Sequence, residues 1–298
     1  MRRLLRRLTL PVRRSNRSAY GMVLPYVLFF SAFVAYPLVF SLVLVFHRWN
    51  IVTPMECVGL KNFGRLMHDP LFTTSLLNTL VFLGIHIPLQ IVIALAFALL
   101  LNSRIRGRGF FRALYFLHVV VSGVVVTILW QQLYGFDYGV LNGLLRRLGA
   151  GPVPWLTDAR MAMPSIAIMA TWKNVGIYIV LFLAGLQTIP RELYDAASVD
   201  GAPPAAQFFR ITLPMLNPTV VVVIVLSTIG GFSLFIEPYV LTGGGPMQST
   251  LSGMLYIYNQ GFYFSHMGYA ATLGVVYAVI ILLVVLLQRR LIEQETYA

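Results

Sequence analysis

The chain has 298 residues, of which 58% are hydrophobic and 11% are charged, and its mean hydropathy is +0.78. Soluble domains carry about 25% charged residues, so this composition excludes an ordinary soluble domain and indicates a membrane protein. The net charge of +12 would suit nucleic-acid binding, but much of it precedes the first apolar run, where an orientation signal beside anionic lipid is the commoner explanation. We therefore expect membrane lipid as a partner and no nucleic acid. The charges in question are Arg2, Arg3, Arg6, Arg7, Arg13, Arg14 and Arg17.

Residues 1–19 form this basic arm, and an uncharged run from Met22 to Phe46 follows it. As a helix the run would be about 37 Å long, enough to cross a hydrocarbon core of about 30 Å with some tilt. A cleaved signal peptide also has a basic start, but its apolar region is only roughly 7–15 residues long and ends at a small-residue cleavage site. The run is longer and no such site follows, so we interpret it as an uncleaved first span.

Five further apolar segments follow, separated by segments rich in polar residues, glycine or proline. We expect an all-α polytopic membrane protein with six transmembrane helices, and hence one transmembrane unit over residues 20–290 and a short tail over 291–298. The later spans are expected at 71–101, 113–134, 163–189, 215–236 and 269–288. The connections are a polar loop at 47–70, a basic turn at 102–112, loops at 135–161 and 243–268, and an acidic corner at 190–212.

Lysine and arginine counts orient these spans, because cytoplasmic loops carry the excess of positive charge. With the N-terminus inside, fifteen of the 22 basic residues fall on the inner side. Both termini and the acidic corner are therefore predicted to be cytoplasmic. The seven basic residues outside this set are Arg48, Lys61, Arg65, Arg146, Arg147, Arg160 and Lys173.

The stretch ELYDAASVDGAPPAAQFFRITLP, from Glu192 to Pro214, covers most of the acidic corner and the two residues after it. Prolines at 190, 203 and 204 interrupt a helix, so residues 191–200 are expected to form a short helix whose first turn is acidic, as the helix dipole favours. Gly201 stands where a C′ glycine would end that helix. On these residues alone, an ordinary solvated loop between spans is a simpler explanation than a docking element for a partner.

The spacing within this corner resembles the EAA loop of ABC importer membrane subunits, which reads Glu-Ala-Ala, three residues, Gly, nine residues and Ile-x-Leu-Pro. Here Asp195-Ala196-Ala197, Gly201 and Ile211-Thr212-Leu213-Pro214 keep both spacings. Asp195 departs from the usual glutamate and is one methylene shorter, with an effect that the sequence leaves open. Further stretches are similar to the sugar-importer branch, the maltose-type permeases: AGLQTIP (184–190), VLTGGGP (240–246) and the segment around Trp172. In all, the resemblance covers roughly residues 20–290.

The resemblance implies an ABC type I importer permease fold in a bacterial inner membrane, with the corner as a coupling helix that docks in a cytoplasmic ATPase. It also implies a second homologous permease subunit, two ATP-binding subunits, expected to be a homodimer, and an extracytoplasmic solute-binding protein. No cofactor is expected in this chain, and ATP and Mg would be bound by the partner ATPase. The ATPase-coupling residues would be Glu192, Asp195, Ala196, Ala197, Asp200 and Gly201.

A candidate solute path lies in the fourth expected span, where Asn174 and Tyr178 are i,i+4 neighbours and Leu181 and Gly185 continue the same face. An amide, a phenol and a glycine gap suit a hydroxyl-rich ligand, and Trp172 would add a stacking surface. The pattern is explained equally well by Trp and Tyr residues placed at the membrane interface and by helix packing through small residues. The resemblance to the maltose-type permeases implies a sugar-facing set of Trp172, Asn174, Tyr178, Gly231, Ser233 and Phe235.

Charged and ionisable residues in or beside the spans allow several roles. Lys173 is expected to snorkel to the outer surface rather than contact solute. Glu237, at the outer end of the fifth expected span, is either a water-facing end charge or a gate residue of the solute path. His86 and His118 lie within apolar spans, where neutral interhelical hydrogen bonding is favoured over a functional ionisation, because neither has a carboxylate neighbour in sequence.

The glycine-rich segment Gly243-Gly244-Gly245-Pro246 lacks the G-K-S/T ending of a phosphate-binding loop. It is either a flexible turn or, by the resemblance, part of the outer surface that receives the binding protein, through Gly244, Gly245 and Pro246. The five histidines are scattered and no serine lies in a G-x-S-x-G turn, so no metal or catalytic site is predicted. Cys57 is the single cysteine, which excludes an intramolecular disulfide.

The expected function is therefore one permease subunit of an ATP-driven, binding-protein-dependent importer, for a sugar or sugar derivative, that works by alternating access. Two alternatives are an ion-coupled secondary carrier or channel without an ATPase partner, and a membrane-bound enzyme. The spans offer few charges for ion coupling, and no catalytic cluster is present. The sequence leaves the solute open between mono- or oligosaccharide, polyol and glycerol phosphate.

Overall fold

A computed structural model describes residues 15–103 and 121–292. Most of the basic arm, the basic turn from residue 104 onward, the first part of the third expected span (113–120, with His118) and the end of the tail lie outside the described residues. Within them the chain is predominantly helical, as predicted, and it also contains two short strands.

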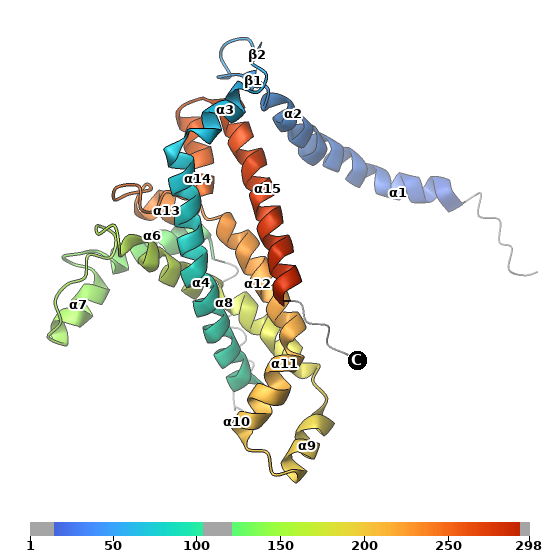
Figure 1. The fold of residues 1–298 in the computed structure, drawn as a ribbon, viewed down its shortest axis with the longest axis vertical. Helices are drawn as coiled ribbons and strands as arrows, with labels where there is room; N and C mark the ends of the chain where they lie inside the picture. Colours follow the sequence, from blue (N-terminus) through green and yellow to red (C-terminus); the bar gives the residue numbers. More distant parts are fainter. Residues whose placement is uncertain (1–14, 104–120, 293–298) are drawn as a thin grey trace, which may run out of the picture.

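Helices α4 (Pro70–Asn102), α8 (Ala162–Gln187), α12 (Asn217–Phe232) and α15 (Met267–Ile292) form the centre of the molecule (Figure 1). α4 and α8 share the most extensive helix–helix contact, and α12 packs against α4, α8 and α15. Small buried residues such as Ala94, Ala98 and Ala167 allow close approach of these helices. The bundle is therefore held by tight packing along α4, which α8 and α12 both contact.

Four helices of the described residues are long and apolar enough to cross a membrane: Tyr20–Leu44, Pro70–Asn102, Ala162–Gln187 and Met267–Ile292. A fifth candidate is the pair Pro204–Met215 and Asn217–Phe232, which is bent by 62°. Pro214 and Pro218 flank this bend and each removes a backbone donor, which accounts for the break. Gly123–Leu133 is apolar but shorter, so the count of six spans stays a prediction.

The first span stands apart from the bundle. It consists of α1 (Ser15–Phe30), the π-helical turn η1 (Ser31–Ala35) and α2 (Tyr36–Leu44), and it extends away from the other helices in Figure 1. Only 6% of its apolar window is buried. Its contact with the bundle is at the end of α2, where α15 begins. There the backbone N–H of Met267 donates to the Trp49 carbonyl at 3.0 Å, and Thr272 Oγ1 donates to the Val45 carbonyl at 3.3 Å.

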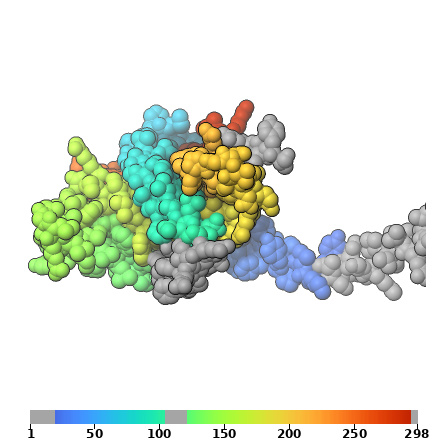
Figure 2. All heavy atoms as spheres, turned by 90° about the horizontal axis from the view of Figure 1, so that it is seen from below, coloured from blue at the N-terminus to red at the C-terminus, as the bar shows by residue number. Residues whose placement is uncertain are grey.

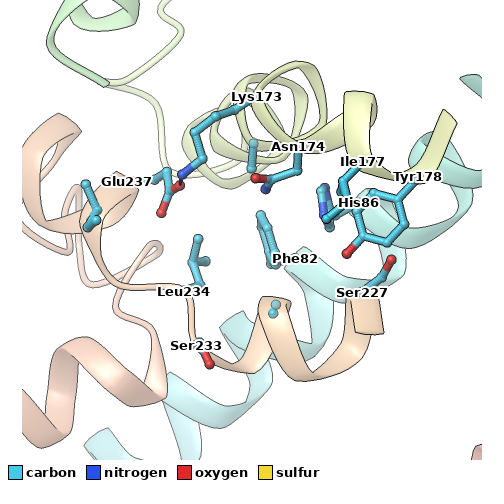
Figure 3. A pocket seen from close by; sticks show the side chains of 14 residues that line it. Phe82, His86, Lys173, Asn174, Ile177, Tyr178, Ser227, Ser233, Leu234 and Glu237 are labelled. Atoms are coloured by element: carbon cyan, nitrogen blue, oxygen red, sulfur yellow. Dashed lines mark hydrogen bonds and ion pairs between the residues drawn. The ribbon is translucent and has the colours of Figure 1, made fainter. Parts of the chain in front are cut away.

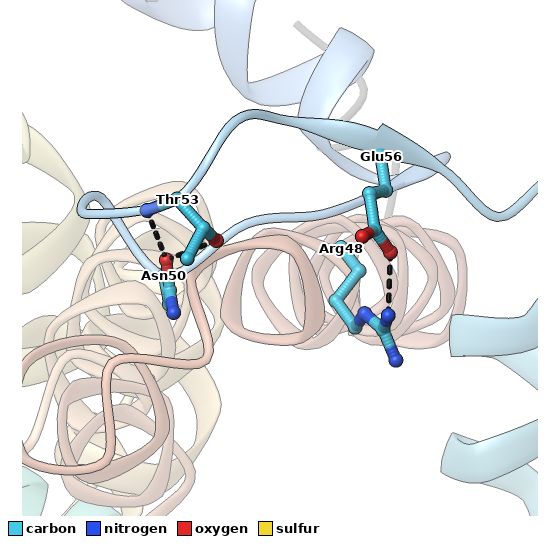
Figure 4. A network of polar contacts seen from close by, with 4 residues as sticks. All are labelled: Arg48, Asn50, Thr53 and Glu56. Atoms are coloured by element: carbon cyan, nitrogen blue, oxygen red, sulfur yellow. Dashed lines mark hydrogen bonds and ion pairs between the residues drawn. The ribbon is translucent and has the colours of Figure 1, made fainter.

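Three segments expected to be loops contain regular structure. Residues 47–70 include an antiparallel pair, β1 (His47–Arg48) with β2 (Glu56–Cys57), and the helix α3 (Lys61–Met67). Arg48 and Glu56 form an ion pair across the two strands, and Asn50 Oδ1 accepts hydrogen bonds from Thr53 in the intervening turn (Figure 4). The other loops contain α7 (Val140–Arg147), α14 (Gly253–Tyr258) and the π-helical turn η3 (Asn259–Tyr263). All are short, so hydropathy alone did not separate them from loops.

A polar network joins α3, α4, α14 and α15 at the end of the molecule that carries the strands. Asp69 caps α4 through the backbone N–H of Leu71 at 2.9 Å, and its carboxylate also accepts hydrogen bonds from the hydroxyls of Tyr256 and Tyr269. The Arg65 guanidinium lies 4.0 Å from the centre of the Tyr269 ring. Burial raises the pKa of the Asp69 carboxyl, but the hydrogen bonds together lower it by more. The pKa therefore lies below its ordinary value. Asp69 therefore acts as a carboxylate that holds four elements in place.

Candidate functional sites: a helical corner and an intramembrane cavity

The short helix expected at 191–200 is present as α9 (Arg191–Val199), with Glu192 in its first turn. It ends in a Schellman motif, because Ala202 N–H donates to the Ala197 carbonyl at 2.9 Å and Gly201 N–H donates to the Ser198 carbonyl at 3.1 Å. Gly201 has φ +74°, a left-handed conformation that glycine adopts without strain. The prediction of a C′ glycine at this position is confirmed.

Side chains brace α9 against the segment that returns to the bundle. That segment consists of α10 (Pro204–Gln207), the π-helical turn η2 (Phe208–Thr212) and α11 (Leu213–Met215). The Tyr194 hydroxyl and Thr212 Oγ1 are 2.9 Å apart, and Gln207 Nε2 donates to Ser198 Oγ at 3.2 Å. We call residues 190–215 the helical corner.

The outer surface of the helical corner is open. No residue of α9 is buried, and the carboxylates of Glu192, Asp195 and Asp200 are exposed. The corner lies at the end of the molecule remote from β1 and β2, beside the end of α4 (Figures 1 and 2). It is thus fixed to the chain on one side and presents a short acidic helix on the other.

A cavity of about 260 Å³ lies between α4, α8, α12 and the short helix α13 (Ile236–Leu241) (Figure 3). At about 1.5 Å per residue, α8 is about 39 Å long and its cavity-lining residues lie near its middle. The lining residues are Phe82, His86, Ala170, Lys173, Asn174, Ile177, Tyr178, Ser227, Gly230, Gly231, Ser233, Leu234, Ile236 and Glu237.

The cavity wall combines neutral polar groups with apolar surface. Asn174 contributes an amide and Tyr178 a phenol, while Phe82, Ile177 and Leu234 contribute apolar faces. Within the described part of the chain, neither the Asn174 amide nor the Tyr178 hydroxyl has a hydrogen-bond partner. These two groups are therefore available to donate to, or accept from, a ligand that enters the cavity.

Polar groups of α4 support the same wall. His86 Nδ1 lies 2.8 Å from Thr171 Oγ1 of α8, so the interhelical hydrogen bond expected for His86 is present. Gln90 is fully buried and its Nε2 donates to Ser227 Oγ at 3.4 Å. No described residue hydrogen-bonds to Gln90 Oε1. Because buried amide oxygens are nearly always paired, this acceptor suits a buried water molecule.

Five of the seven residues predicted for the solute path line this cavity, namely Asn174, Tyr178, Gly231, Ser233 and Glu237. Trp172 and Phe235 do not line it. Trp172 is 45% exposed and its ring packs against Trp130, with centroids 5.5 Å apart. Phe235 packs between Tyr239 and Tyr258. On α8, successive side chains differ by about 100°, so Trp172 points away from the face that Asn174 and Tyr178 share.

The glycine gap expected at Gly185 is filled by a neighbouring helix. A Cβ at Gly185 would lie 2.3 Å from Thr219 Oγ1, so this position allows α12 to pack against α8. Gly231 acts in the same way toward α4, because a Cβ there would lie 2.3 Å from Leu83 Cδ2. The face that begins at Asn174 therefore changes from cavity wall to helix packing beyond Tyr178.

The expectation that Lys173 snorkels outward is wrong. Its ammonium group forms an ion pair with the Glu237 carboxylate, and the two side chains are 18% and 7% exposed. The fifth span was expected to run to residue 236, but α12 ends at Phe232, and Ser233 to Phe235 lead into α13. Glu237 is consequently in the first turn of α13, on the cavity wall, rather than at a water-facing span end. Sequence reasoning missed this pair, although each partner is a lone charge in an apolar segment.

The glycine-rich segment at 243–246 forms a hydrogen-bonded turn. Gly243 and Gly244 have φ values of +62° and +92°. Gly244 N–H donates to the Pro238 carbonyl at 3.3 Å, and Thr250 Oγ1 donates to the Gly245 carbonyl at 2.7 Å. Gly245 and Pro246 also line a second cavity, of about 510 Å³, with aromatic side chains on its wall. The contact of this turn with a binding protein stays a prediction.

Comparison with known proteins identifies the class. Residues 8–294 match the family described as binding-protein-dependent transport system inner membrane component, and the chain belongs to that family. It is 37% identical to the arabinooligosaccharides transport system permease protein AraP of Bacillus subtilis, over 91% of this chain and 87% of that protein. It is 38% identical to the lactose transport system permease protein LacF of Rhizobium radiobacter, over 89% of each chain.

A solved structure shares the fold. The chain is similar to a chain in the crystal structure of a bacterial alginate ABC transporter in complex with an alginate pentasaccharide-bound periplasmic protein. The TM-score is 0.78 at 25% identity, with 92% of this chain and 93% of that chain covered. The family expected from the corner motif is confirmed, and the chain is a permease component rather than a stand-alone carrier or channel.

Proposed function

We propose that this chain is one permease subunit of an ATP-driven importer for a sugar or sugar derivative, with the cavity between α4, α8, α12 and α13 as its part of the solute path. The observation that carries this proposal is the make-up of the cavity wall near the middle of α8. There an amide and a phenol without a hydrogen-bond partner among the described residues lie beside apolar faces. Sugars present hydroxyl groups at their rims and C–H groups on their ring faces, which match these two kinds of surface. The relatives AraP and LacF, named for arabinooligosaccharides and lactose, support the same substrate class.

The helical corner would couple the cavity to ATP hydrolysis. Its exposed helix α9 would dock in a cytoplasmic ATP-binding subunit that holds ATP and Mg, through Glu192, Asp195, Ala196, Ala197, Asp200 and Gly201. The hydrogen bond between Tyr194 and Thr212 and the helical path through η2 and α11 would carry motion into α12. Because α12 contributes Ser227 and Gly231 to the cavity, movement of the corner would change the cavity wall and permit alternating access.

Each chain has one helical corner, so two permease chains would be needed to engage two ATP-binding subunits. A second homologous permease would form the other half of the pore, and two ATP-binding subunits, as a homodimer, would receive one corner each. The basic arm at 1–19, the tail at 291–298 and the corner would be cytoplasmic. A solute-binding protein would dock on the opposite side, with Gly244, Gly245 and Pro246 among its contacts. The periplasmic protein in the alginate transporter complex supports such a partner.

Co-purification from the native membrane tests this assignment. The tagged full-length chain is expected to bring down a second permease and an ATP-binding subunit in stoichiometric amounts. In vesicles, the complex with its binding protein should hydrolyse ATP faster when arabinotriose, lactose, maltose or trehalose is supplied. Purification of the chain without any ATPase, or ATP hydrolysis that no sugar in the panel stimulates, would contradict the proposal.

Replacement of Tyr178 with phenylalanine should weaken solute use without affecting assembly. Loss of one hydrogen bond of about 1.4 kcal/mol corresponds to a tenfold rise in the solute KM of the assembled importer. Tyr36→Phe is the matched control, because Tyr36 is 67% exposed on the first span and lies outside the cavity. Transport kinetics in vesicles give the KM, and the ATPase content of the purified complex reports assembly. If Tyr178→Phe lowers the ATPase content with an unchanged KM, Tyr178 has a packing role.

A further inference from the structure

The charge of the solute is left open by the comparisons. Lactose and arabinooligosaccharides are uncharged, whereas the structurally similar transporter imports the acidic polysaccharide alginate. The proposed cavity contains the side chains that decide between these cases. Among the described residues that line it, only Lys173 and Glu237 belong to the four residue types lysine, arginine, aspartate and glutamate.

The geometry commits these two charges to each other. Lys173 reaches across from α8 to Glu237 in the first turn of α13, and both side chains point toward one another at the cavity wall (Figure 3). α6 (Gly123–Leu133) lies beside this ion pair, since a Cβ at Gly123 would lie 3.6 Å from Lys173 Nζ and 3.7 Å from Ile236 Cδ1. The Lys173 ammonium group therefore lies between α6, α8 and α13, with the Glu237 carboxylate as its ion-pair partner.

A buried charge is stable only when it is paired, and removal of one partner leaves the other uncompensated. An acidic solute that approached the Lys173 ammonium would meet the Glu237 carboxylate beside it, so the pair offers no net positive charge to balance a second anion. A neutral solute needs no such balancing charge. It can use Asn174 and Tyr178, which have no hydrogen-bond partner among the described residues.

We propose that Glu237, by neutralising Lys173, makes the cavity selective for uncharged, hydroxyl-rich solutes and excludes sugars that carry carboxylate or phosphate groups. This inference rests on the proposed function, and it narrows the solute to neutral saccharides or polyols. It assigns Glu237 and Lys173 a shared role as specificity-determining residues. Neither residue alone would have that role, because a single charge would attract ions of the opposite sign.

The test uses the complete importer in vesicles, with its binding protein, second permease and ATPases, and four versions of this chain. These are the wild type, Glu237→Gln, Lys173→Met and the double variant Lys173→Met with Glu237→Gln. Uptake of a neutral sugar from the panel is measured against three competitors. Trigalacturonate is anionic, its methyl ester is the neutral compound of matched shape, and the glucosamine trimer is cationic. The binding protein is the same throughout, so differences between versions report the permease.

In the wild type, neutral sugars should be taken up and trigalacturonate should not. Glu237→Gln should lower the inhibition constant of trigalacturonate at least tenfold and leave that of the methyl ester unchanged. Lys173→Met should do the same for the glucosamine trimer. The double variant should return both constants to within about threefold of the wild type. The inference predicts opposite charge preferences for the two single variants. Either variant can therefore test it if the other fails to assemble.

Uptake of trigalacturonate by the wild type as efficiently as a neutral sugar would overturn the inference. So would inhibition constants that are the same in the wild type and in each single variant that assembles. Failure of the wild type to take up any sugar in the panel is a different result, since it contradicts the proposed function itself.

Discussion

Replacement of Gly201 with valine is expected to reduce solute-dependent uptake at least tenfold while the chain still inserts and assembles with its second permease. Gly201 has φ +74°, where a residue with a Cβ is strained by roughly 1–2 kcal/mol and a β-branched residue by more. A Cβ at this position would meet no atom of the described residues within 4 Å. The substitution therefore acts on the backbone conformation alone. It removes the Schellman hydrogen bonds of Gly201 and Ala202 and unwinds the last turn of α9.

The unwound turn would move Asp200 and the carboxyl end of α9 away from the docking surface that we propose for the ATPase. Gly201→Asn is the matched control, because asparagine tolerates the left-handed conformation and is found at helix C′ positions. Sugar-stimulated ATP hydrolysis and uptake in vesicles are measured for both variants, and protease accessibility of the corner reports its folding. Full uptake by the valine variant, with the corner cleaved faster by protease, would show that the ordered end of α9 is not needed for coupling.

Local features of this chain could be predicted from sequence because their causes are local. Gly201 follows a short acidic helix and precedes two prolines, so its left-handed conformation and the end of α9 depend on neighbours within a few residues. The long spans at Pro70–Asn102 and Ala162–Gln187 were predicted within a few residues for the same reason. Asn174 and Tyr178 share a helix face, and that spacing alone brought both to one wall of the cavity.

Features that depend on where the chain turns back were missed. The ion pair joins residues far apart in sequence, and it forms because α12 ends at Phe232 and a second helix begins at Ile236. Apolar residues continue through this break, so hydropathy gives no sign of it. The direction of Trp172 and Phe235 was missed because aromatic side chains can pack equally well on solute or on other rings. The isolation of the first span from the bundle likewise has no signal in its composition.

The attachment of that first span gives the second large effect. Replacement of Gly268 with alanine is expected to destabilise the chain by at least about 2–3 kcal/mol, as overpacking of a close contact does. A Cβ at Gly268 would lie 1.8 Å from the His47 carbonyl oxygen and 3.2 Å from the Leu44 carbonyl oxygen. Both obstacles are backbone atoms, so no side chain can rotate to relieve the clash. The start of α15 would have to move away from the end of α2, which breaks the hydrogen bond from Met267 N–H to the Trp49 carbonyl.

Gly274→Ala in the same helix is the matched control, since a Cβ at Gly274 would meet no atom within 4 Å in the part of the chain that the structure describes. It should be neutral or slightly stabilising, because alanine is favoured over glycine within a helix by roughly 0.5–1 kcal/mol. Thermal unfolding of the purified complex in detergent compares the two variants, and a protease site placed at residue 52 in the turn between β1 and β2 reports detachment of α2. Equal melting temperatures for the two variants, with the turn equally protected, would mean that the first span is held mainly by a partner chain. The contact at Gly268 would then be a consequence of that packing rather than its cause.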